Sequence, residues 1–274
     1  MALRACASSL AVNLASVRNE RPVLSVVTPV YNSARYLSET LESVSRLATP
    51  HEHLVVDGDS TDGTVELLEA RDDPQLRWVS EPDRGQTHAV NKGFAQARGE
   101  LLGWLNGDDE YVAAAVDRAV ARLLREPGID AVYGSMEITD EDGITRRVYR
   151  PWRFNWRLYL FLGDYVTTPT IIFRRKLLDP VGLLDETYVD AADYDFYLRL
   201  LRRARVERVP EPLVRFRYHP ESKTGRDYVR GQQEALRIRL KWARSRRERL
   251  LMDGLHRLKH SVLPRISRWP RMYS

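Results

Sequence analysis

The chain has 274 residues and a single cysteine, Cys6, which excludes an intramolecular disulfide and a zinc site built from cysteines. It lacks any apolar run of the roughly 18 to 20 residues that a membrane-spanning helix needs. No GxGxxG motif follows the first apolar segment, which disfavours the dinucleotide-binding fold of a dehydrogenase. Internal repeats and low-complexity segments are also missing. With 43% hydrophobic residues, the chain can still bury a sizeable core.

The first residues do not have the composition of a secretory signal. In MALRACASSLAVNLASVRNE the apolar residues are interrupted by Ser and Asn, whereas a signal peptide has an unbroken apolar core. We therefore expect residues 1–21 to form an N-terminal extension.

Charge is distributed unevenly, although the net charge is +5. Residues 226–274 carry 14 Lys and Arg against 4 Asp and Glu, whereas residues 1–225 carry 29 against 34. This predicts a mildly acidic body and a basic tail that meets an anionic surface. Apolar residues recur at helical spacing in the tail, at Leu255, Leu258, Val262, Ile266 and Trp269. The spacing fits an interfacial helix on anionic lipid, or a helix packed on the body with a solvated basic face.

Between residues 22 and 130, strand and helix patterns alternate. Apolar, β-branched runs predict strands over 24–30, 53–56, 76–79 and 101–105. Helical periodicity follows each of them, through Leu37 to Val44, Val65 to Leu68, 86–98 and 112–124. Such alternation predicts an α/β fold with a parallel sheet, whose ligands bind outside the carboxyl ends of the strands.

Residues 131–225 predict an α+β half that completes the same domain. We expect a hairpin around Asp140 to Gly143, a strand in TPTIIFRR, a helix over 193–204 and two short strands over 206–220, separated by prolines. The predicted organisation is an extension (1–21), a domain (22–225, with halves 22–130 and 131–225) and a basic helical tail (226–274).

An acidic tip follows the fourth predicted strand. In GWLNGDDEY, residues 103–111, the apolar run ends in Asn106, Gly107 and Asp108. Carboxylate and amide oxygens are the ligands that hard divalent cations prefer, often together with a substrate diphosphate. Alternatively, Asp109 or Glu110 caps the helix that begins near Val112.

Further polar residues at strand ends and on predicted helices could bind a ligand or transfer a proton. Asp57 ends the second strand and could accept hydrogen bonds from a base, while Arg84 and Lys92 could meet phosphates. Helix phasing places Asn91 and Lys92 away from the core face; a solvated helix surface would have the same pattern. Asp193 is a candidate general base, with a helix cap as the alternative.

The aromatic residues Trp152, Trp156 and Tyr159 fall at helical spacing. They fit a platform for a sugar or a lipid chain, or part of the core.

Six of these segments occur in an order that resembles glycosyltransferase family 2. They are SVVTPVYN, VVDGDSTDGT, EPDRGQTHAVNKGFAQARGELLGWLNGDD, the IIFRR to VGLLDE segment, ADYDFYLR and RYHPESKTG, and they cover roughly residues 22–225. The resemblance implies a GT-A fold, a Rossmann-like nucleotide-diphospho-sugar transferase with a mixed sheet flanked by helices. It also implies transfer from a UDP-, dTDP- or GDP-sugar to an acceptor hydroxyl with inversion, in cell-envelope polysaccharide or glycolipid synthesis.

The resemblance assigns the nucleotide-sugar site to residues of these motifs: Pro29, Tyr31, Asp57, Arg84, Asn91, Lys92, Asn106, Gly107, Asp108 and Lys223. It implies Mg²⁺ or Mn²⁺ held by Asp108, Asn106 and His219. Asn106 stands where the family has the first carboxylate of its DxD motif, which lowers the expected charge at the metal.

The catalytic base of the family falls on Asp193. Ala192 replaces an acid that often precedes this base, so Asp195 is a second candidate.

The expected partners are a nucleotide-sugar donor, a glycan or glycolipid acceptor and a membrane surface contacted by 226–274, with no nucleic acid. We expect a cytoplasmic protein, peripheral on the inner face of the plasma membrane if the tail binds lipid. Because of Asn106 and Ala192, one alternative is a non-catalytic nucleotide-sugar-binding protein. Another is a basic nucleic-acid-binding protein, although no groove-reading motif is present.

Overall fold

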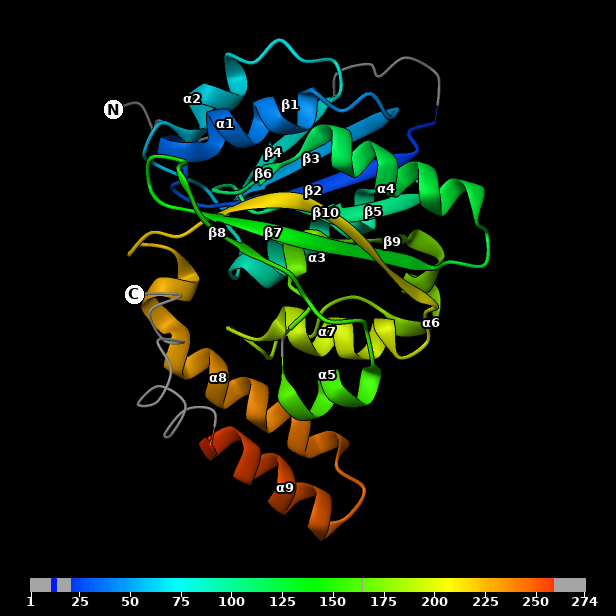
Figure 1. Ribbon diagram of the computed structural model, residues 1–274. Coiled ribbons are helices and arrows are strands. Elements are labelled where there is room, and N and C mark those ends of the chain that lie inside the picture. Colours follow the sequence, from blue (N-terminus) through cyan, green and yellow to red (C-terminus); the bar gives the residue numbers. More distant parts are fainter. Residues whose placement is uncertain (1–10, 14–20, 164, 259–274) are drawn as a thin grey trace, which may run out of the picture.

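The protein is built around one mixed sheet with the strand order β1-β4-β3-β2-β5-β9-β7-β10-β6, and β8 pairs with β7 outside this path. The computed structural model describes residues 11–13, 21–163 and 165–258 (Figure 1). The strands are β1 (Ala11–Asn13), β2 (Leu24–Val30), β3 (His51–Asp57), β4 (Leu76–Ser80), β5 (Leu101–Trp104), β6 (Glu110–Tyr111), β7 (Ala131–Thr139), β8 (Thr145–Tyr149), β9 (Ile171–Arg174) and β10 (Val206–Arg217).

The first half of the sheet is parallel, as the alternating pattern predicts. β2 pairs with β3 on one side and with β5 on the other, and β3 pairs with β4, all in parallel. Every residue of β2 and β3 is buried, which explains why β2 and the Leu54–Val56 part of β3 show no alternation of apolar and polar residues. The polar residues at the start of β3, His51 to His53, are buried as well. Their carboxyl ends therefore lie at one edge of the sheet.

The helices cover both faces of this sheet. They are α1 (Ala34–Ser45), α2 (Thr64–Glu69), α3 (Gln86–Gln96), α4 (Ala113–Arg125), α5 (Trp156–Leu162), α6 (Leu178–Val181), α7 (Ala192–Leu201), α8 (Lys223–Trp242) and α9 (Arg246–Arg257), with 3₁₀ turns at Thr168–Thr170 and Arg175–Leu177. Alternating residues of β2 face opposite layers, since Val26 packs with Val44 and Val116 of α1 and α4, whereas Val27 packs with Phe94 of α3. The expected mixed sheet flanked by helices is confirmed.

In the second half, antiparallel strands extend the sheet. β9 pairs antiparallel with β5 and β7, and the predicted β7–β8 hairpin is present. β10 pairs in parallel with β7, and β6 pairs antiparallel with β10.

The prediction of two short strands over 206–220 is wrong, because β10 is a single strand, Val206–Arg217. Its register with β7 shifts between Arg208 and Pro212 and again between Pro212 and Val214. β6 pairs with β10 only at residues 214 and 215, so the prolines lie where this edge of β10 has no strand partner among the described residues. Proline, which has no N–H to donate, is tolerated at such a position.

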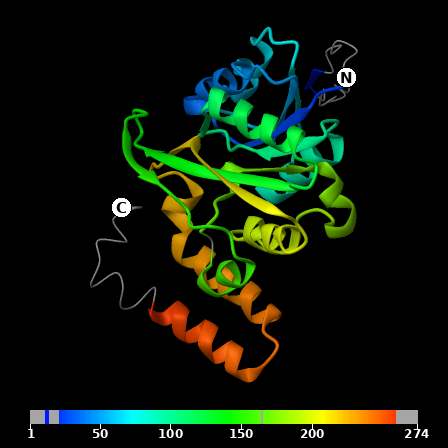
Figure 2. The ribbon, with the colours of Figure 1, turned by 45° about the vertical axis from the view of Figure 1, so that its right-hand side comes forward.

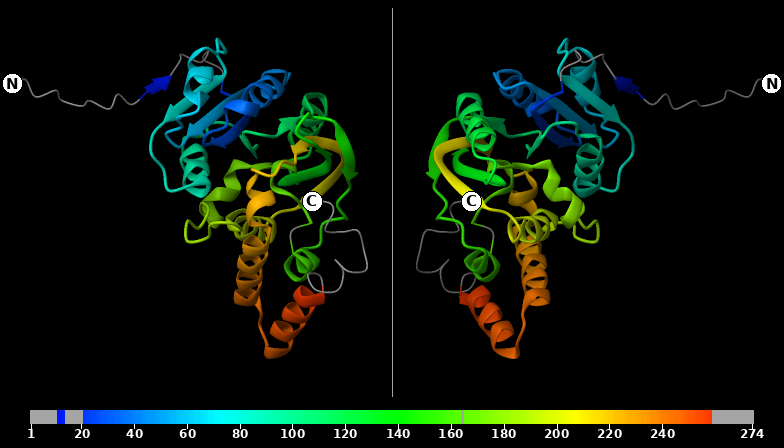
Figure 3. Two further views of the ribbon diagram at one scale, coloured as in Figure 1. Left: turned by 90° about the vertical axis from the view of Figure 1, so that its left-hand side faces the viewer. Right: turned by 90° about the vertical axis from the view of Figure 1, so that its right-hand side faces the viewer.

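The described part of the basic tail packs against the body. α8 begins at Lys223, so the predicted boundary at residue 225 falls inside a helix. Ile238 of α8 and Met252 of α9 are fully buried in the same core cluster as Tyr159 and Phe196. Figures 2 and 3 show α8 and α9 as a helical hairpin that extends away from the sheet.

Parts of the N-terminal and tail predictions lie outside the described residues. Of the extension over 1–21, the structure describes residue 21 and the segment 11–13, which pairs with β4 as β1. Of the predicted apolar spacing in the tail, Leu255 and Leu258 are described, whereas Val262, Ile266 and Trp269 are not. No helix in the described part of the chain is both long enough and apolar enough to cross a membrane.

The three aromatic residues at helical spacing have different environments. Tyr159 of α5 is fully buried, as the core interpretation predicts, and Trp156 packs on Trp242 with ring centroids 5.5 Å apart. Trp152 precedes α5 and is 62% exposed.

Candidate active site

The loops that follow β2 and β3 form one unit at the carboxyl edge of the sheet. The Gly58 N–H donates to the Val30 carbonyl over 3.0 Å. Asn32 crosses between the loops, since its N–H donates to Ser60 Oγ (2.7 Å) and its Oδ1 accepts from the Thr61 N–H (2.9 Å). Asn32 has φ = +50°, a left-handed conformation that asparagine adopts more readily than most residues. These contacts fix the loops around the end of β2.

Three predicted nucleoside-pocket residues lie in this region. Pro29 is buried within β2, and Tyr31, two residues later, is 66% exposed. Asp57 is fully buried at the end of β3, where it accepts hydrogen bonds from the N–H and Oγ of Ser60 and from Ser80 Oγ (2.6 Å). Asp57 therefore anchors the loop over 58–64, and its contact with a base stays a prediction.

Asn106 is tied into the edge of the sheet by three hydrogen bonds. Its Oδ1 accepts from Gln86 Nε2 (3.0 Å) and from Trp104 Nε1 (3.1 Å), and its Nδ2 donates to Asp109 Oδ2 (3.0 Å). The oxygen that would ligate a metal is thus already occupied by two donors. Asn106 fits a role in fixing the tip better than a role as metal ligand.

Asp108 and His219 meet across the site although 111 residues separate them. His219 Nε2 lies 3.1 Å from Asp108 Oδ2, and the His219 ring packs on Tyr36 with centroids 4.9 Å apart. His219 is buried, yet its Nδ1 has no hydrogen-bond partner among the described residues.

The Asp108–His219 pair fits a divalent cation. Two neighbouring ligands of an octahedral ion at about 2.1 Å lie about 3.0 Å from each other, close to the observed 3.1 Å. The described residues hold no cluster of three or more His, Cys, Asp and Glu side chains suited to a metal. Water and substrate oxygens would therefore complete the coordination, as they often do for Mg²⁺.

Asp109 points away from this pair into the protein. It is fully buried and its Oδ1 accepts from the Arg217 N–H over 3.1 Å. Burial, together with the neighbouring charge of Asp108, raises the pKa of Asp109 well above its usual range. Its carbonyl accepts from Thr40 Oγ1 (2.8 Å), so Asp109 fixes the tip against α1 instead of capping α4.

Gly107, between Asn106 and Asp108 in the sequence, lies at a point of close packing. A Cβ at this position would lie 2.7 Å from Val30 Cγ1 of β2. Glycine is therefore required by packing here, independently of any contact with a sugar nucleotide.

Arg217, which the sequence did not single out, organises this end of the site. Its side chain is 2% exposed and donates to the carbonyls of Asp108 (3.2 Å) and Glu141 (2.9 Å). It also pairs with Glu39 and Glu110. One feature of the sequence could have pointed to Arg217: it is a basic residue at the end of a predicted strand, two positions before His219.

The start of α3 connects the acidic tip to the start of α8. Gln86 Nε2 donates to Asn106, and Gln86 Oε1 accepts from Lys223 Nζ over 3.1 Å. Lys223 also donates to the Val189 carbonyl (2.5 Å). The structure thus connects Lys223 to the acidic tip through one intervening side chain, and its contact with a diphosphate stays a prediction.

Asn91 does not lie on a solvated helix face, so that alternative is wrong, and its contact with a nucleotide sugar stays a prediction. It is 8% exposed, its Oδ1 accepts from the Leu184 N–H (2.9 Å) and its Nδ2 donates to the Leu184 carbonyl (3.0 Å). These bonds hold the loop before α7 against α3. Helical periodicity assigns the face opposite the sheet to solvent, and it cannot show that the loop before α7 covers this face.

Arg84 and Lys92 are both engaged in ion pairs. Arg84 pairs with Glu186 at 2.5 Å, and Lys92 pairs with Glu81 at 2.7 Å. Arg84 remains 68% exposed and could exchange its partner for a phosphate, whereas Lys92 is largely covered. Their contacts with a donor stay predictions.

Gly93 of α3 has a packing role. A Cβ there would meet Val27 Cγ1 at 2.3 Å, so glycine lets α3 approach β2.

The two candidate bases differ in their surroundings. Asp193 is half-buried at the start of α7, and its Oδ2 accepts from Thr168 Oγ1 (2.7 Å). Asp195 pairs with Arg199 in the same helix (2.8 Å), and Arg199 also donates to carbonyls at positions 181 and 183. Asp195 thus fixes the loop after α6, which leaves Asp193 as the candidate general base.

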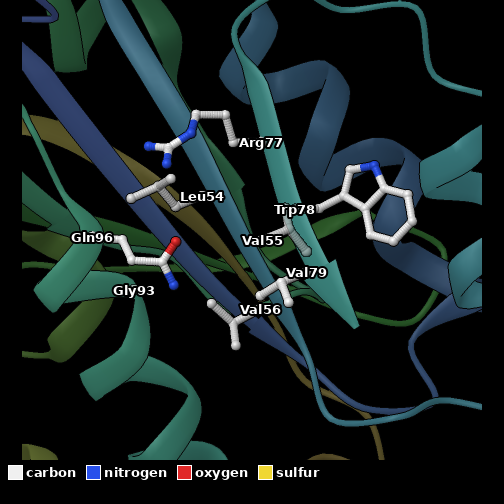
Figure 4. A pocket seen from close by; sticks show the side chains of 8 residues that line it. All are labelled: Leu54, Val55, Val56, Arg77, Trp78, Val79, Gly93 and Gln96. Atoms are coloured by element: carbon white, nitrogen blue, oxygen red, sulfur yellow. The ribbon is translucent and has the colours of Figure 1, made fainter. Parts of the chain in front are cut away.

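A cavity of about 80 Å³ lies between α3 and the strands β3 and β4 (Figure 4). Its lining is largely apolar: Leu54, Val55, Val56, Arg77, Trp78, Val79, Gly93 and Gln96. Ligand sites usually measure 300 to 1,000 Å³, so this cavity is too small for a sugar nucleotide.

The glycosyl transferase family 2 model matches residues 25–180. Among curated proteins, the chain is 26% identical to an uncharacterized glycosyltransferase of Rickettsia felis, over 73% of this chain and 35% of the relative. It is 32% identical to an uncharacterized glycosyltransferase of Mycobacterium tuberculosis, over 65% of this chain and 68% of the relative. An O-antigen biosynthesis protein, RfbC of Myxococcus xanthus, is 31% identical over 78% of this chain and 17% of that protein. The chain spans about a third of the length of the Rickettsia relative.

Solved structures confirm the expected GT-A fold. TarS 1–349 of S. aureus in complex with UDP-GlcNAc superimposes with a TM-score of 0.67 at 22% identity, over 87% of this chain and 73% of TarS. The mannosyltransferase PcManGT of Pyrobaculum calidifontis, in complex with GDP-Man and Mn²⁺, gives 0.63 at 21% identity, over 89% and 71%.

Proposed function

The chain belongs to glycosyltransferase family 2, and from this premise we propose that it moves a sugar from a nucleoside-diphosphate sugar to an acceptor hydroxyl with inversion at the anomeric carbon. The observation that carries this proposal is the Asp108–His219 pair, 3.1 Å apart at the carboxyl edge of the parallel strands. That edge is where α/β sheets bind their ligands. A divalent cation would be held by this pair and would supply charge neutralisation to the diphosphate leaving group.

The chain's own residues divide the remaining work. Lys223 lies one side chain from Asn106 and adds positive charge for the diphosphate. Asp193 accepts the proton of the acceptor hydroxyl while that oxygen attacks the anomeric carbon from the face opposite the leaving group. A carboxylate within hydrogen-bond reach of the acceptor hydroxyl can take up this proton as the new bond forms. Thr168 orients one of its oxygens and leaves lone pairs for the acceptor.

We place the acceptor among glycans or glycolipids. Support comes from RfbC, named an O-antigen biosynthesis protein, although this chain spans only 17% of it. TarS was solved with UDP-GlcNAc and PcManGT with GDP-Man, so both uridine and guanosine donors deserve testing. Contact of residues 226–274 with a membrane surface stays a prediction; in the described part of this segment, Ile238 of α8 and Met252 of α9 are packed on the body.

A nucleotide-sugar-binding protein without turnover is the second candidate. It is favoured by Asn106, whose oxygen is occupied by Gln86 and Trp104. It predicts donor binding that is never followed by hydrolysis or transfer.

The test is a thermal-shift panel of UDP-, GDP- and dTDP-sugars with and without Mn²⁺, because a ligand that binds the folded state raises its melting temperature. The matching donor is then incubated with acceptors, and NMR of the product reports the anomeric configuration. We expect Asp108→Ala to lose the Mn²⁺-dependent shift. Asp193→Asn should keep that shift and lose transfer by at least about a hundredfold.

Glu69→Gln, an exposed substitution at the end of α2, serves as the control and should change neither property. Turnover that survives Asp108→Ala at full rate would remove the metal assignment. Donor binding without turnover in the wild type, for every acceptor tried, would favour the binding protein.

A further inference from the structure

Resting on the proposed function, we propose that the acceptor is an anionic glycan, which carries carboxylate or phosphate groups, and that it binds along a strip formed by Arg147, Arg150, Trp152 and Arg153. This strip begins in β8 and continues into the segment that leads to α5. The proposal names the substrate class of the acceptor side, which the donor residues do not define.

The charged residues of the strip are all basic. From residue 143 to residue 163 the sequence contains five arginines and neither Asp nor Glu. Arg147, Arg150 and Arg153 are all exposed, and no ion pair to an acid is present for them among the described residues. Such a concentration of unpaired guanidinium groups raises the local concentration of anions and favours their binding.

Three of the four acids of the neighbouring hairpin, Glu137, Asp140 and Glu141, are already paired with other arginines. The fourth, Asp142 at the turn, is exposed and has no ion pair among the described residues. The hairpin therefore offsets at most one of the three positive charges of the strip.

The strip lies between the proposed metal site and the candidate base, Asp193. At its beginning, the hairpin turn after β7 is bound to the metal end of the site, because Arg217 donates to the Glu141 carbonyl and Arg35 of α1 pairs with Glu141 at 2.8 Å. Figure 1 shows this turn beside α1 and β8 leading from it towards α5. An acceptor on the strip would thus extend away from the metal-binding tip.

Strand β8, where the strip begins, is also bound to the segment that contacts the candidate base. Residues two apart in a strand share a face, so Arg147 lies on the same face as Tyr149. The Tyr149 hydroxyl donates to the Tyr165 carbonyl (2.9 Å), and three residues later Thr168 donates to Asp193. Arg147 therefore faces the side from which an acceptor would reach Asp193.

Trp152 provides a surface for a sugar ring beside these charges. It is 62% exposed, its ring lies against Tyr165 with centroids 6.0 Å apart, and its carbonyl accepts from the Tyr133 hydroxyl over 2.7 Å. An exposed but anchored aromatic ring can stack on a sugar at little entropic cost. Guanidinium groups on both sides of it match carboxylates and phosphates on that sugar chain.

The experiment measures binding of end-labelled oligosaccharides to the full chain by fluorescence anisotropy at low salt. The probes are oligogalacturonate and its methyl ester, and phosphorylated oligomannose and its unphosphorylated form. The test variant is Arg147→Gln/Arg150→Gln/Arg153→Gln. Its matched control is Arg246→Gln/Arg247→Gln/Arg249→Gln, which removes three exposed arginines from α9. Vesicles that contain phosphatidylglycerol test whether lipid headgroups are the source of the anions.

We expect at least one anionic probe to bind more tightly than its neutral counterpart. The strip variant should weaken that binding roughly tenfold, because each exposed ion pair contributes a factor of roughly 1.5 to 5 at low salt. The α9 control should change it less than twofold.

Equal binding of charged and neutral probes, or equal losses in the two triple variants, would overturn the proposal. So would binding of the vesicles, lost in the strip variant, without preference for either anionic glycan. A donor thermal shift recorded on the same samples keeps the two proposals separate. If donor binding is present and the anionic preference is absent, only the inference about the acceptor fails.

Discussion

Replacing Arg217 tests whether one buried guanidinium holds together the end of the site where we propose that a metal binds. The side chain is 2% exposed, lies 4.7 Å from the Tyr36 ring centroid and reaches four oxygen acceptors on three different segments. Arg217→Met keeps most of the volume and removes every one of these donors. The backbone N–H of residue 217 still donates to Asp109, so β10 itself need not move.

The expected loss in the free energy of unfolding depends on how exposed the partners of Arg217 are. Breaking a buried ion pair by removing one partner costs roughly 3–5 kcal/mol. Glu110 is 19% exposed and keeps only its longer ion pair with Arg215 at 3.6 Å, whereas Glu39 is 54% exposed and regains water. The carbonyls of Asp108 and Glu141 lose charge-assisted hydrogen bonds worth about 1.5 kcal/mol each. Because these contributions overlap, we expect Arg217→Met to lower the free energy of unfolding by about 3 kcal/mol.

Urea denaturation measures that loss, and a Mn²⁺ titration with the donor sugar measures its effect on the site. Residues that orient metal ligands typically change metal affinity 10- to 100-fold, so we expect the apparent Mn²⁺ affinity to fall at least about tenfold. Arg215→Met is the matched control on the same strand. Arg215 is 46% exposed and pairs with Glu110 and Glu137 at 3.6 and 3.2 Å, so its loss should cost less than about 1 kcal/mol.

Two results would refute this reasoning. If Arg217→Met and Arg215→Met destabilise the protein equally, burial does not decide the cost. If Arg217→Met is destabilised as expected but binds Mn²⁺ with unchanged affinity, Arg217 supports the fold and does not position Asp108.

Two further predictions concern the sheet beneath the site. Burial lowers the pKa of His53 to about 3, and its Nε2 is 2.9 Å from Thr28 Oγ1. Because the unfolded pKa is about 6.5, the unfolded state gains a proton first as pH falls, and wild type should lose about 2 kcal/mol more than His53→Gln between pH 7.5 and 5.0. Parallel urea-denaturation curves at both pH values would contradict this. Gly93→Ala should cost about 2 kcal/mol because the added Cβ meets Val27 Cγ1 at 2.3 Å. The same substitution in a Val27→Ala background should cost much less, and an equal cost in both backgrounds, measured by urea denaturation, would reject overpacking as the cause.

Local patterns in the sequence were sufficient to predict the main strands and helices and their order along the chain. The run LSVVTPV predicted β2 with its observed bounds, and the helical spacing of Leu37, Leu41 and Val44 predicted α1. These predictions succeed because strand and helix periodicity is set by neighbours a few residues away. The same patterns placed the Asn106–Asp108 group at the end of a strand, where a parallel sheet collects its functional residues.

Contacts between distant segments decided which of these side chains share the site. Adjacent acids at the tip look alike in the sequence, yet Asp108 meets His219, whereas Asp109 turns inward to the backbone of Arg217, 108 residues away. The helix pattern alone is consistent with a solvated Asn91, because the residues around it carry no sign of the loop at Leu184 that covers it.

The sequence by itself thus determined the family, the fold class, the strand that ends in the acidic tip and the candidate base at Asp193. Only the tertiary structure decided that Asp108 faces His219, that Arg217 is buried among four acceptors and that β10 continues through its prolines. The physical reason is that a side chain's direction and burial depend on which segments pack against it. That packing is a property of the whole folded chain and not of a few neighbouring residues.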